Sequence, residues 1–575
     1  MQKIWKIKKE QPEKDETFFG GKYSRIVLQI LANRGIKKPE EIEKFFSFSY
    51  DQDVADPFLF FAMEKAVERI ISAKEKKEKI TVYGDYDADG VTATVILVEA
   101  LRNLGFENLD YYIPNRYDEG YGLNIGAIEE IRKRKTDLII TVDCGVSNFS
   151  EAEKVKELGM DMVITDHHHI ISGRVPEAVA VLNPHIEDGG YNFPDLSGAG
   201  VAFKLVQALY KKMAPEKIDQ LKWALDLAAV GTIADCVPLL GENRALVKYG
   251  LVVLSKTKRT GLQELFKVGR IIINENAIPD AHKVAFQIAP RINAAGRMDH
   301  ANVSCELIMQ KNAVMARDLA LQLEEKNQQR QKMTMEIVRE AQAIAENSFK
   351  NKKFIFAYSE NWPVGILGLA AGRIADEFNK PVMILQKRDG FFVGSLRSIP
   401  QLNIAEVLEE CAELLDRFGG HSQAAGAQIK AENIDKFYEK FSSLIEEKLA
   451  GQDLSPIVEA DAEMNPEDVS WELLEQIKKM APFGEGNEEP VFLMKGMLVE
   501  DFRLVGNGNK HIKMGLRGKN GSPKIFETIG FSMGEKAVKI RAGSELDIMF
   551  SIQEDEWNGN KKIQLNLVDF KIISE

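Results

Sequence analysis

The chain has 575 residues and a formal net charge of −12, and its 45% hydrophobic and 28% charged content is that of an ordinary globular protein. The length is too great for one hydrophobic core and predicts about three or four domains, while no apolar run approaches the roughly 18 residues that span a bilayer. Four scattered cysteines without a C-x-x-C pair argue against a zinc ribbon, and a start without an apolar stretch argues against a signal peptide, so a cytoplasmic protein is expected, with a monomer as the default.

A helical preface is expected over residues 1–55, and helical and strand patterns then alternate up to about residue 240. Apolar, β-rich runs predict extended segments at 80–83, 111–114, 138–142 and 162–165. Amphipathic patterns predict helices at 92–104, 125–134 and 150–158. This βαβ rhythm predicts a mainly parallel sheet with helices on both faces, in a domain that we place at 56–300.

Acidic or histidine side chains end four short segments of this domain. Three of these segments follow or close predicted strands, at Asp85, Asp143 and Asp166. Polar side chains at the carboxyl ends of parallel strands converge in one crevice of an open α/β sheet. So many carboxylates would repel each other unless cations bind there, and the set therefore predicts a metal site for two ions. Its members are Asp85, Asp87, Asp89, Asp143, Asp166, His167, His168 and Asp235.

The acidic loop at Asp85, Asp87 and Asp89 has other interpretations when it is taken alone. A loop that ends at a helix start can cradle a phosphate, and its carboxylates can simply cap the helix. Adding Asp143, the Asp166-His167-His168 group and Asp235 favours the metal site. Carboxylate oxygens with one or two imidazoles, and no thiolate set, favour Mn²⁺ or Mg²⁺ over structural zinc.

One long helical pattern covers residues 303 to about 347, within a connecting segment that we place at 301–348. Between Glu324 and Lys332 the pattern is almost wholly polar. A helix that is polar all round typically bridges two domains through solvent. A second α/β unit is expected over 349–452.

From about residue 453 to residue 575 the sequence changes to short alternating strands with Gly and Asn turns, which suggests a small all-β barrel. Basic residues gather in one stretch of it: Arg503, Lys510, His511, Lys513, Arg517, Lys519 and Lys524. The overall negative charge is a weak argument against a nucleic-acid partner, because acidic residues at a metal site need not face the ligand. A solvated hairpin edge that resists aggregation explains the basic stretch equally well.

The metal-site residues resemble the DHH phosphoesterase superfamily, which is named for the Asp-His-His found here at 166–168. The same resemblance extends to Pro114–Arg116, Gly120–Gly122, Pro290–Arg297, Gly394–Ser398, Gly419–Gly426 and Pro482–Asn487. These motifs occur in order over nearly the whole chain, as in the members that degrade single-stranded DNA from 5′ to 3′. The resemblance implies a multidomain α/β fold with a DHH parallel-sheet domain, the connecting helix, a second α/β (DHHA1) domain and a C-terminal all-β OB-fold.

Carried over by position, the resemblance implies catalytic roles for Asp85, Asp143 and His168. It implies metal ligation by Asp87, Asp89, Asp143, His167 and Asp235. Asp143 is the candidate to bridge two ions, His168 would contact the scissile phosphate or assist proton transfer, and Asp85 would orient a ligand. Tyr83 stands where small DHH pyrophosphatases place a ligating histidine, which leaves the occupancy of one metal site open.

The resemblance also implies a path for the substrate strand, lined by Arg116, Arg291, Asn293, Arg297, Ser395, Arg397, Gly420 and His421. Arginine offers bidentate bonds to phosphate, although any one of these arginines could equally form a surface or interdomain ion pair. Ser395 and Arg397 would hold the 5′-terminal phosphate and so explain polarity and mononucleotide release. In the barrel, Phe492, Phe502 and Trp557 could stack on bases or fill the core.

The function expected from the resemblance is a single-stranded-DNA-specific 5′→3′ exonuclease of DNA recombination and repair. A metal-activated water would hydrolyse each phosphodiester and release mononucleotides. A single-strand-binding protein and a helicase are implied as partners. Two other functions stay open: a DHH phosphoesterase for short oligonucleotides or cyclic dinucleotides, and a scaffold that binds DNA without cutting it.

Overall fold

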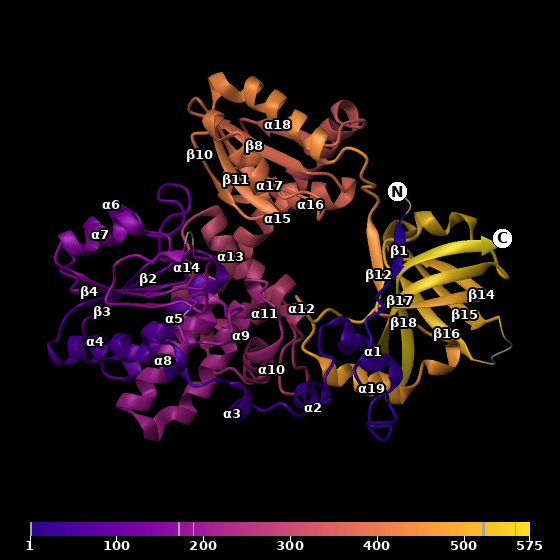
Figure 1. The fold of residues 1–575 in the computed structure, drawn as a ribbon, viewed down its shortest axis with the longest axis horizontal. Helices are drawn as coiled ribbons and strands as arrows, with labels where there is room; N and C mark the ends of the chain where they lie inside the picture. Colours follow the sequence, from indigo (N-terminus) through magenta and orange to yellow (C-terminus); the bar gives the residue numbers. More distant parts are fainter. Residues whose placement is uncertain (1–2, 171–172, 188, 520–523, 558, 575) are drawn as a thin grey trace. The chain divides into compact units, whose positions relative to one another are not determined.

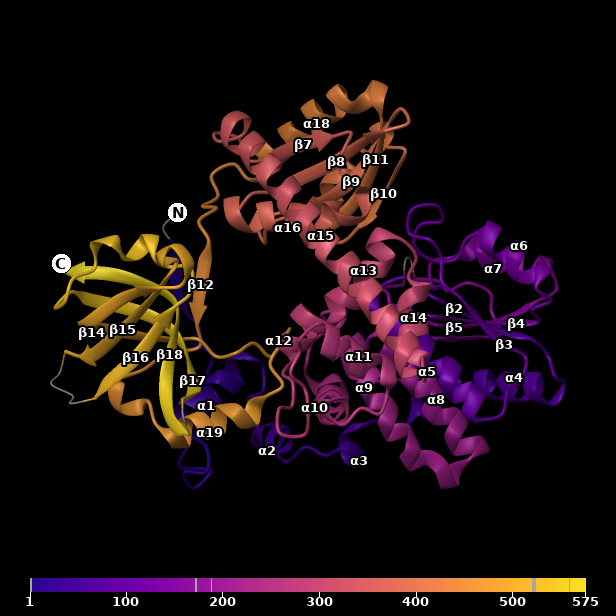
Figure 2. The same ribbon diagram turned by 180° about the vertical axis from the view of Figure 1, so that it is seen from behind.

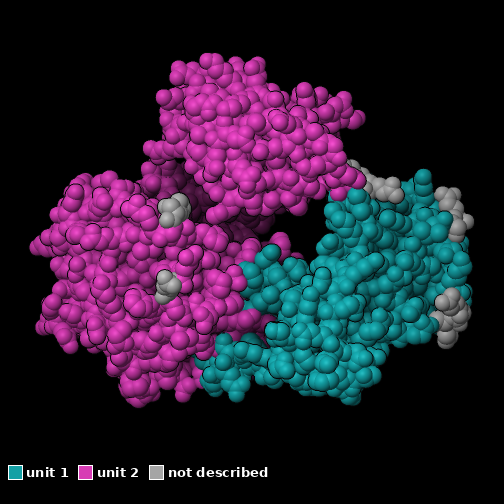
Figure 3. Space-filling model, in the orientation of Figure 1, with its two compact units in different colours: residues 1–53, 238–240, 456–575 teal, residues 54–237, 241–455 magenta. Residues whose placement is uncertain are grey.

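The computed structural model describes residues 3–170, 173–187, 189–519, 524–557 and 559–574. The chain forms two compact units, which Figure 3 colours separately. Unit 1 comprises Met1–Asp53, Pro238–Leu240 and Pro456–Glu575, and unit 2 comprises Val54–Val237 and Gly241–Ser455. The finer domain boundaries stay predictions.

A five-stranded parallel sheet forms the first part of unit 2 (Figure 1). Its strands, in spatial order, are β3 (Leu109–Tyr112), β2 (Ile80–Gly84), β4 (Leu138–Val142), β5 (Asp161–Thr165) and β6 (Ala180–Leu182). Every residue of β2 and β4 is buried, as expected for central strands covered on both faces. The predicted parallel sheet is therefore confirmed.

Helices cover both faces of this sheet (Figures 1 and 2). One face carries α6 (Ile125–Lys133) and α7 (Phe149–Glu157). The other carries α4 (Met63–Glu75), α5 (Ala88–Asn103) and α8 (Gly198–Met213). Further helices follow in the chain: α9 (Leu225–Ala234), α10 (Gly241–Ser255), α11 (Thr260–Val268), α12 (Ala281–Lys283), α13 (Ala289–Met298) and α14 (Asn302–Met309).

The long helix α15 (Ala313–Ser348) has 36 residues, and it corrects two expectations. The single helix predicted from residue 303 is wrong, because α14 ends at Met309 and Asn312 begins a new helix by accepting bonds from the N–H groups of Val314 and Met315. The polar stretch lies in solvent on one side only. Gln328, Gln329 and Gln331 are exposed, whereas Asn327 is buried and Glu324 pairs with Arg291 of α13. Polar contacts therefore replace water on the inner side of the helix.

A second, mixed sheet completes unit 2, in the order β10-β11-β9-β8-β7. Its strands are β7 (Ile355–Ser359), β8 (Val382–Arg388), β9 (Phe391–Arg397), β10 (Arg417–Gly420) and β11 (Ala424–Lys430). One face packs against α15 and α16 (Val364–Phe378). The other packs against α17 (Ile404–Glu409) and α18 (Ile434–Lys448). Two apolar cores therefore hold β9 and its side chains in place.

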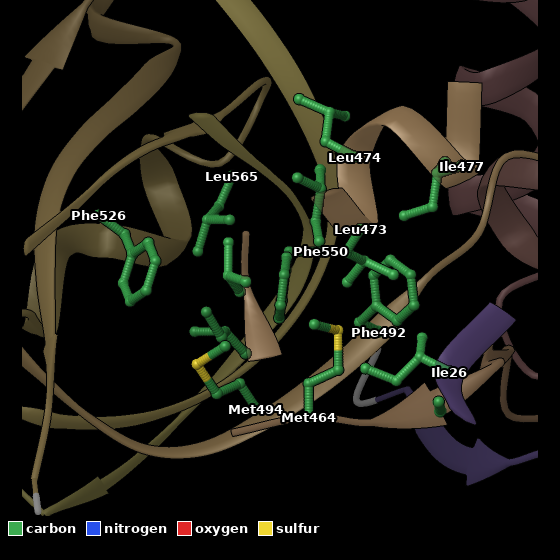
Figure 4. Close-up of a cluster of buried hydrophobic side chains, with 14 of the residues drawn as sticks. Ile26, Met464, Leu473, Leu474, Ile477, Phe492, Met494, Phe526, Phe550 and Leu565 are labelled. Atoms are coloured by element: carbon green, nitrogen blue, oxygen red, sulfur yellow. The ribbon is translucent and has the colours of Figure 1, made fainter. Parts of the chain in front are cut away.

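Unit 1 contains a closed barrel of five strands, which confirms the expected C-terminal fold. Its strands are β14 (Phe492–Val505), β15 (His511–Gly518), β16 (Ile525–Gly530), β17 (Glu545–Trp557) and β18 (Asn560–Ser574). The order β14-β15-β16-β18-β17 closes because β14 also pairs with β17. Phe492, Met494, Phe526, Phe550 and Leu565 fill the interior (Figure 4).

The start of the chain belongs to the same unit as the barrel. Beside the expected helices α1 (Arg25–Asn33), α2 (Pro39–Ser47) and α3 (Tyr50–Asp53) it contains a strand, β1 (Ile4–Ile7), which pairs in parallel with β12 (Ile457–Ala460). Ile26 of α1 and Ile477 of α19 (Trp471–Met480) join the cluster of buried apolar residues that includes the barrel interior (Figure 4). A two-residue strand, β13 (Ala462–Glu463), adds to β14.

The three candidate stacking aromatics of the barrel lie in different places. Phe492 is fully buried in the core, whereas Phe502 on β14 is 36% exposed. The side chain of Trp557 lies outside the described residues. Among the helices that the structure describes, none combines the length and the apolarity needed to cross a membrane.

Candidate metal centre and phosphate pocket

The carboxyl edge of the first sheet brings the predicted acidic residues together. Strands β2, β4 and β5 end at Gly84, Val142 and Thr165, and each is followed directly by an aspartate. Asp87 caps α5, its carboxylate accepting bonds from the N–H groups of Asp89 and Gly90 at 2.9 and 3.1 Å. The capping role and the metal role therefore fall on one loop.

A first cluster of possible ligands contains Asp89, His167 and Asp235, whose ligand atoms lie within 4.8 Å of one another. Nε2 of His167 lies 3.5 Å from a carboxylate oxygen of Asp235 and 4.0 Å from one of Asp89. Asp89 accepts bonds from the N–H groups of Gly198 and Ala199, at 2.6 and 2.9 Å, where α8 begins. The first turn of α5, which contains Asp89, and the first turn of α8, which bonds to its carboxylate, together fix the position of this group.

A second cluster contains Asp85, Asp87 and Asp143, again within 4.8 Å. Oδ1 of Asp143 lies 3.1 Å from Nε2 of His167, so Asp143 connects the two clusters. The backbone of Asp143 is left-handed, with φ at 62°. Such a conformation is uncommon outside glycine and gathers at functional sites.

The clusters hold more negative charge than the chain itself neutralises. Burial and then the neighbouring carboxylates raise the pKa of Asp85 and Asp143 well above the usual range, and raise the pKa of Asp89 to about 7 and of Asp235 to about 9. Oδ1 of Asp85 is buried without a hydrogen-bond partner among the described residues, and Oδ1 of Asp143 and Nε2 of His167, although 3.1 Å apart, form no hydrogen bond with each other or with another described group. These unpartnered ligand atoms and the oxygen-rich donor set fit Mn²⁺ or Mg²⁺.

Adjacent histidines have opposite electrostatic surroundings. Burial, and then the charge of His168, lowers the pKa of His167 to about 3, so His167 offers a neutral imidazole. Burial also opposes the charged form of His168, but a 2.8 Å bond from its Nδ1 to Asp166 outweighs it and raises the pKa to about 9. His167 is therefore suited to a cation and His168 to an anion.

Two residues support the site. Asp166 was counted in the predicted metal-site set without a role of its own, and Tyr121 was not assigned to the site. Asp166 accepts bonds from the N–H groups of His167 and Val146 as well as from His168. The hydroxyl of Tyr121 lies 3.1 Å from Nδ1 of His168 and 3.3 Å from the carbonyl oxygen of Asp143. The only sequence signal for Tyr121 was its place in the Gly120-Tyr121-Gly122 motif.

Tyr83 takes no part in either cluster. Its ring is fully buried and stacked on Tyr112, and its hydroxyl donates to the carbonyl of Gly122 at 2.9 Å. Asp85 completes the second cluster instead, so this cluster does not need a histidine at position 83.

Three of the predicted substrate arginines lie close together. The guanidinium of Arg116 lies 4.8 Å above the ring of Tyr86, and Arg297 donates to the carbonyl of Gly365 at 3.2 Å. Arg397 donates to Oγ of Ser395 at 2.9 Å. Burial and then the charge of Arg116 lower the pKa of Arg297, to about 10, and that of Arg397.

No carboxylate of the described part of the chain forms an ion pair with Arg116, Arg297 or Arg397. Partly buried guanidiniums without an acidic partner are suited to a phosphate group, which accepts bidentate bonds from arginine. The structure therefore groups Arg116, Arg297 and Arg397, with Ser395 beside Arg397, into one cluster, which is named the arginine pocket below.

The other predicted substrate residues are placed differently. Arg291 is held by Glu324 at 2.6 Å and by the carbonyl of Gln287, and Asn293 accepts a 2.6 Å bond from the N–H of Ala88 at the start of α5. These contacts give Arg291 and Asn293 structural roles; their roles toward substrate stay predictions. Gly420 ends β10, and the exposed His421 lies with its ring 6.4 Å from that of His169.

Three family models match consecutive parts of the chain. The DHH family N-terminal domain matches residues 79–232, the DHHA1 domain matches residues 351–447, and the RecJ OB domain matches residues 460–569. Together they cover the two sheets of unit 2 and the barrel of unit 1.

Similar proteins match over nearly the whole length. The chain is 37% identical over 546 residues to the single-stranded-DNA-specific exonuclease RecJ of Bacillus subtilis, covering 95% of this chain and 67% of that protein. It is 31% identical over 558 residues to the Escherichia coli protein of the same description, covering 94% of each. RecJ of Thermus thermophilus in complex with Mn²⁺ matches with a TM-score of 0.82 and 27% identity, over 99% of this chain and 79% of that one. The same protein in complex with Mg²⁺ matches with a TM-score of 0.77 and 26% identity, over 99% and 78%.

Proposed function

The chain belongs to the RecJ family of single-stranded-DNA-specific exonucleases, and we propose that it removes mononucleotides from the 5′ end of single-stranded DNA in recombination and repair. The observation that carries this proposal is the pair of linked acidic clusters with three buried, unpartnered ligand atoms. Both clusters lie in the same unit as the arginine pocket, and all their residues except Asp235 fall within the match to the DHH family N-terminal domain.

Each cluster would hold one divalent ion. Asp89, His167 and Asp235 would hold the first, Asp85 and Asp87 the second, and Asp143 would serve both. Bound Mn²⁺ or Mg²⁺ supplies an activated water and stabilises the charge that develops on a phosphodiester. The helix starts at α5 and α8 keep the carboxylates fixed before any ion arrives, because their N–H groups already hold Asp87 and Asp89.

His168 would act on the substrate rather than on an ion. Its bond to Asp166 involves Nδ1 and stabilises the protonated ring, while Nε2 lies 3.3 Å from the hydroxyl of Tyr121. In place of that contact, Nε2 would donate to a phosphate oxygen or give its proton to the leaving oxygen. Tyr121 contacts the same ring and so restrains its orientation. The cationic donor and the acidic clusters together meet the needs of phosphodiester hydrolysis.

The arginine pocket accounts for polarity. Arg116, Arg297 and Arg397, with the hydroxyl of Ser395, would bind the 5′-terminal phosphate. A strand held by that end presents its first internucleotide linkage at a constant distance from the acidic clusters. Cleavage there releases one nucleotide at a time and leaves a new 5′ phosphate for the next cycle.

The barrel offers a second candidate surface for single-stranded DNA. On neighbouring strands, Arg503 of β14 faces Lys513 of β15, and the exposed ring of Phe502 lies beside this pair in the sequence. Arg517 and Lys519 are less available, because they pair with Glu500 and Glu545. Basic groups beside an exposed aromatic suit a single strand, whose bases can stack while its phosphates are neutralised.

Cleavage of a long single strand labelled at its 5′ end tests the function, with and without Mn²⁺ and beside a blunt duplex. Metal-dependent release of the labelled mononucleotide, with the duplex left intact, supports metal use, strand choice and polarity together. Release from the 3′ end, or activity confined to strands of two to five nucleotides, would contradict the proposal. Binding of the long strand without cleavage would favour the scaffold function.

A further inference from the structure

The positive charge of the phosphate pocket continues beyond the residues assigned to it. Arg330 on α15 and Arg373 on α16 belong to neither the metal clusters nor the predicted substrate path. After the larger effect of burial, and then of Arg116, the charge of Arg330 contributes to the lowered pKa of Arg297; after burial, the charges of Arg373 and Arg291 lower the pKa of Arg330. Within the described ranges, neither Arg330 nor Arg373 has a carboxylate partner.

Arg330 is held in place and yet keeps an unused donor. Its Nη2 donates to Oδ1 of the buried Asn327 at 2.8 Å, which fixes the side chain against α15. Its Nε is buried without any hydrogen-bond partner. A buried donor left unsatisfied costs about 1–3 kcal/mol, and more when it is charged, so an anion at this position would stabilise it.

A face of α16 without side chains begins beside the pocket. Gly368 and Gly372 of α16 are four residues apart and therefore lie on the same face. A Cβ at Gly368 would lie 2.9 Å from Nη2 of Arg397 and 3.2 Å from Oγ of Ser395, so the helix backbone touches the pocket there. A Cβ at Gly372 would meet nothing within 4 Å, so open space follows one turn further on, next to Arg373 in the sequence.

The charges also exceed what one terminal phosphate needs. A phosphate monoester carries about −1.5 to −2 charges at neutral pH. Arg116, Arg297 and Arg397 already supply three positive charges, and Arg330 and Arg373 add two more.

We propose that Arg330 and Arg373 bind the outer phosphates of a strand that ends in a 5′ di- or triphosphate, so that such ends are a substrate class of this site. The inference rests on the proposed function, which places the first phosphate at Arg397 and Ser395. In the reaction, water adds to the phosphorus of the first internucleotide linkage, and the 3′ oxygen of the first nucleoside leaves and takes up a proton. The first product is then a nucleoside 5′-triphosphate, and the shortened strand carries an ordinary 5′ monophosphate.

The test uses one single strand made with a 5′ hydroxyl, a 5′ monophosphate or a 5′ triphosphate, and the full chain with Mn²⁺. The unmodified protein is expected to have about tenfold higher kcat/KM for the first cleavage of the triphosphate end than of the monophosphate end, as one added charged contact would give. Arg330→Gln should bring this ratio to about one while it leaves cleavage of the monophosphate end unchanged. Arg339→Gln, at an exposed arginine of the same helix, should keep the ratio.

The two proposals fail in different ways. Equal kcat/KM for both ends in the unmodified protein, or an equal loss on both ends in Arg330→Gln, would overturn the inference and leave the exonuclease function intact. Lack of cleavage at the 5′ monophosphate end would instead contradict the proposed function. Arg373→Gln provides a second variant at an exposed position, where folding is not at risk, and it should lower the same ratio.

Discussion

The carboxyl edge of the first sheet and the barrel of unit 1 handle charge in opposite ways. At the sheet edge, Asp85, Asp89 and Asp143 are buried, and neighbouring carboxylates raise their pKa. In the barrel the interior is apolar, and surface charges lie in ion pairs such as Lys562 with Glu527. The barrel is stabilised by its own core, whereas the sheet edge is arranged for a ligand that the chain does not supply.

This difference teaches where function lies in the molecule. Buried polar groups normally find partners, so a buried carboxylate without one marks a place where selection has kept an unfavourable group. In the barrel, by contrast, the buried carboxylate of Asp569 has partners, because it pairs with Lys536 and accepts a 2.8 Å bond from the indole N–H of Trp5. Substitutions at the sheet edge and in the barrel should therefore have different effects on activity and stability.

The largest effect is expected for Asp143→Asn, which removes the charge that both clusters share. Hydrolysis should fall by several orders of magnitude, as seen when one member of a cooperating catalytic set is lost. The metal-free variant should also unfold at a higher temperature near pH 8, because a buried carboxylate with raised pKa no longer ionises. Steady-state cleavage and calorimetry measure the two effects.

Asp161→Asn is the matched control, since Asp161 begins β5 at the other edge of the sheet and pairs there with Arg69 while half exposed. It should change neither the rate nor the metal dependence. Full activity in Asp143→Asn would remove the assignment of this edge as the metal centre.

The stability of the barrel should depend on its buried apolar side chains and not on its surface charges. Phe550→Ala removes a fully buried ring that lies 5.9 Å from Phe492, and should lower the free energy of unfolding of unit 1 by about 3–5 kcal/mol. Phe502→Ala, at a ring that is 36% exposed, should cost far less. Hydrogen exchange of β14 and β17 locates the change; equal effects of the two substitutions would show that the barrel is not stabilised by this core.

The stability of unit 2 without metal should fall as pH rises from about 6.5 to 9. Asp89 and Asp235 have pKa values of about 7 and 9 in the folded chain, above the ordinary carboxyl value, so ionising them favours unfolding. His168, with a pKa of about 9, loses its stabilising charge over the same range, and His167, with a pKa of about 3, is neutral in both states above pH 6.5.

Mn²⁺ should reverse this trend and stabilise unit 2 more at pH 8 than at pH 6.5. At a hundredfold excess over the dissociation constant the gain is about 2.7 kcal/mol per site. Differential scanning calorimetry in EDTA and in Mn²⁺ gives both curves. A larger gain at the lower pH would contradict the raised carboxyl pKa values.

The smallest effect is expected at the barrel surface. Lys562→Ala breaks the exposed pair with Glu527, and should change the free energy of unfolding by less than about 1 kcal/mol. Urea unfolding of the variant and of the unmodified chain checks this. A loss comparable with that of Phe550→Ala would mean that surface pairs, and not the core, stabilise the barrel.

Local patterns were enough to predict the strands and the acidic edge. β2, β4 and β5 are short apolar runs that end in aspartate, and the rule that parallel strands end at one edge brought Asp85, Asp143 and His167 together. The assignment of a catalytic function to these residues depended on their resemblance to a known superfamily. Without that resemblance, the residue types and their positions at the strand ends predicted a metal site and no more.

Contacts between distant residues could not be predicted in this way. Asn293 accepts a hydrogen bond from the N–H of Ala88, which is 205 residues away in the sequence. Asp89 accepts one from the N–H of Gly198, which is 109 residues away. The ion pair of Arg291 with Glu324 likewise depends on how α13 packs against α15, and the sequence around Arg291 did not indicate it. The break before α15 was missed because apolar spacing continues through it, although Asn312 is a typical capping residue.

Isothermal titration calorimetry of the full chain with Mn²⁺ at pH 8 tests the central claim most directly. The account predicts two ions per chain, bound with release of protons because carboxyl groups of raised pKa must ionise, and loss of both in Asp143→Asn. Binding of two ions that is unchanged in Asp143→Asn, or no binding by the unmodified chain, would contradict it.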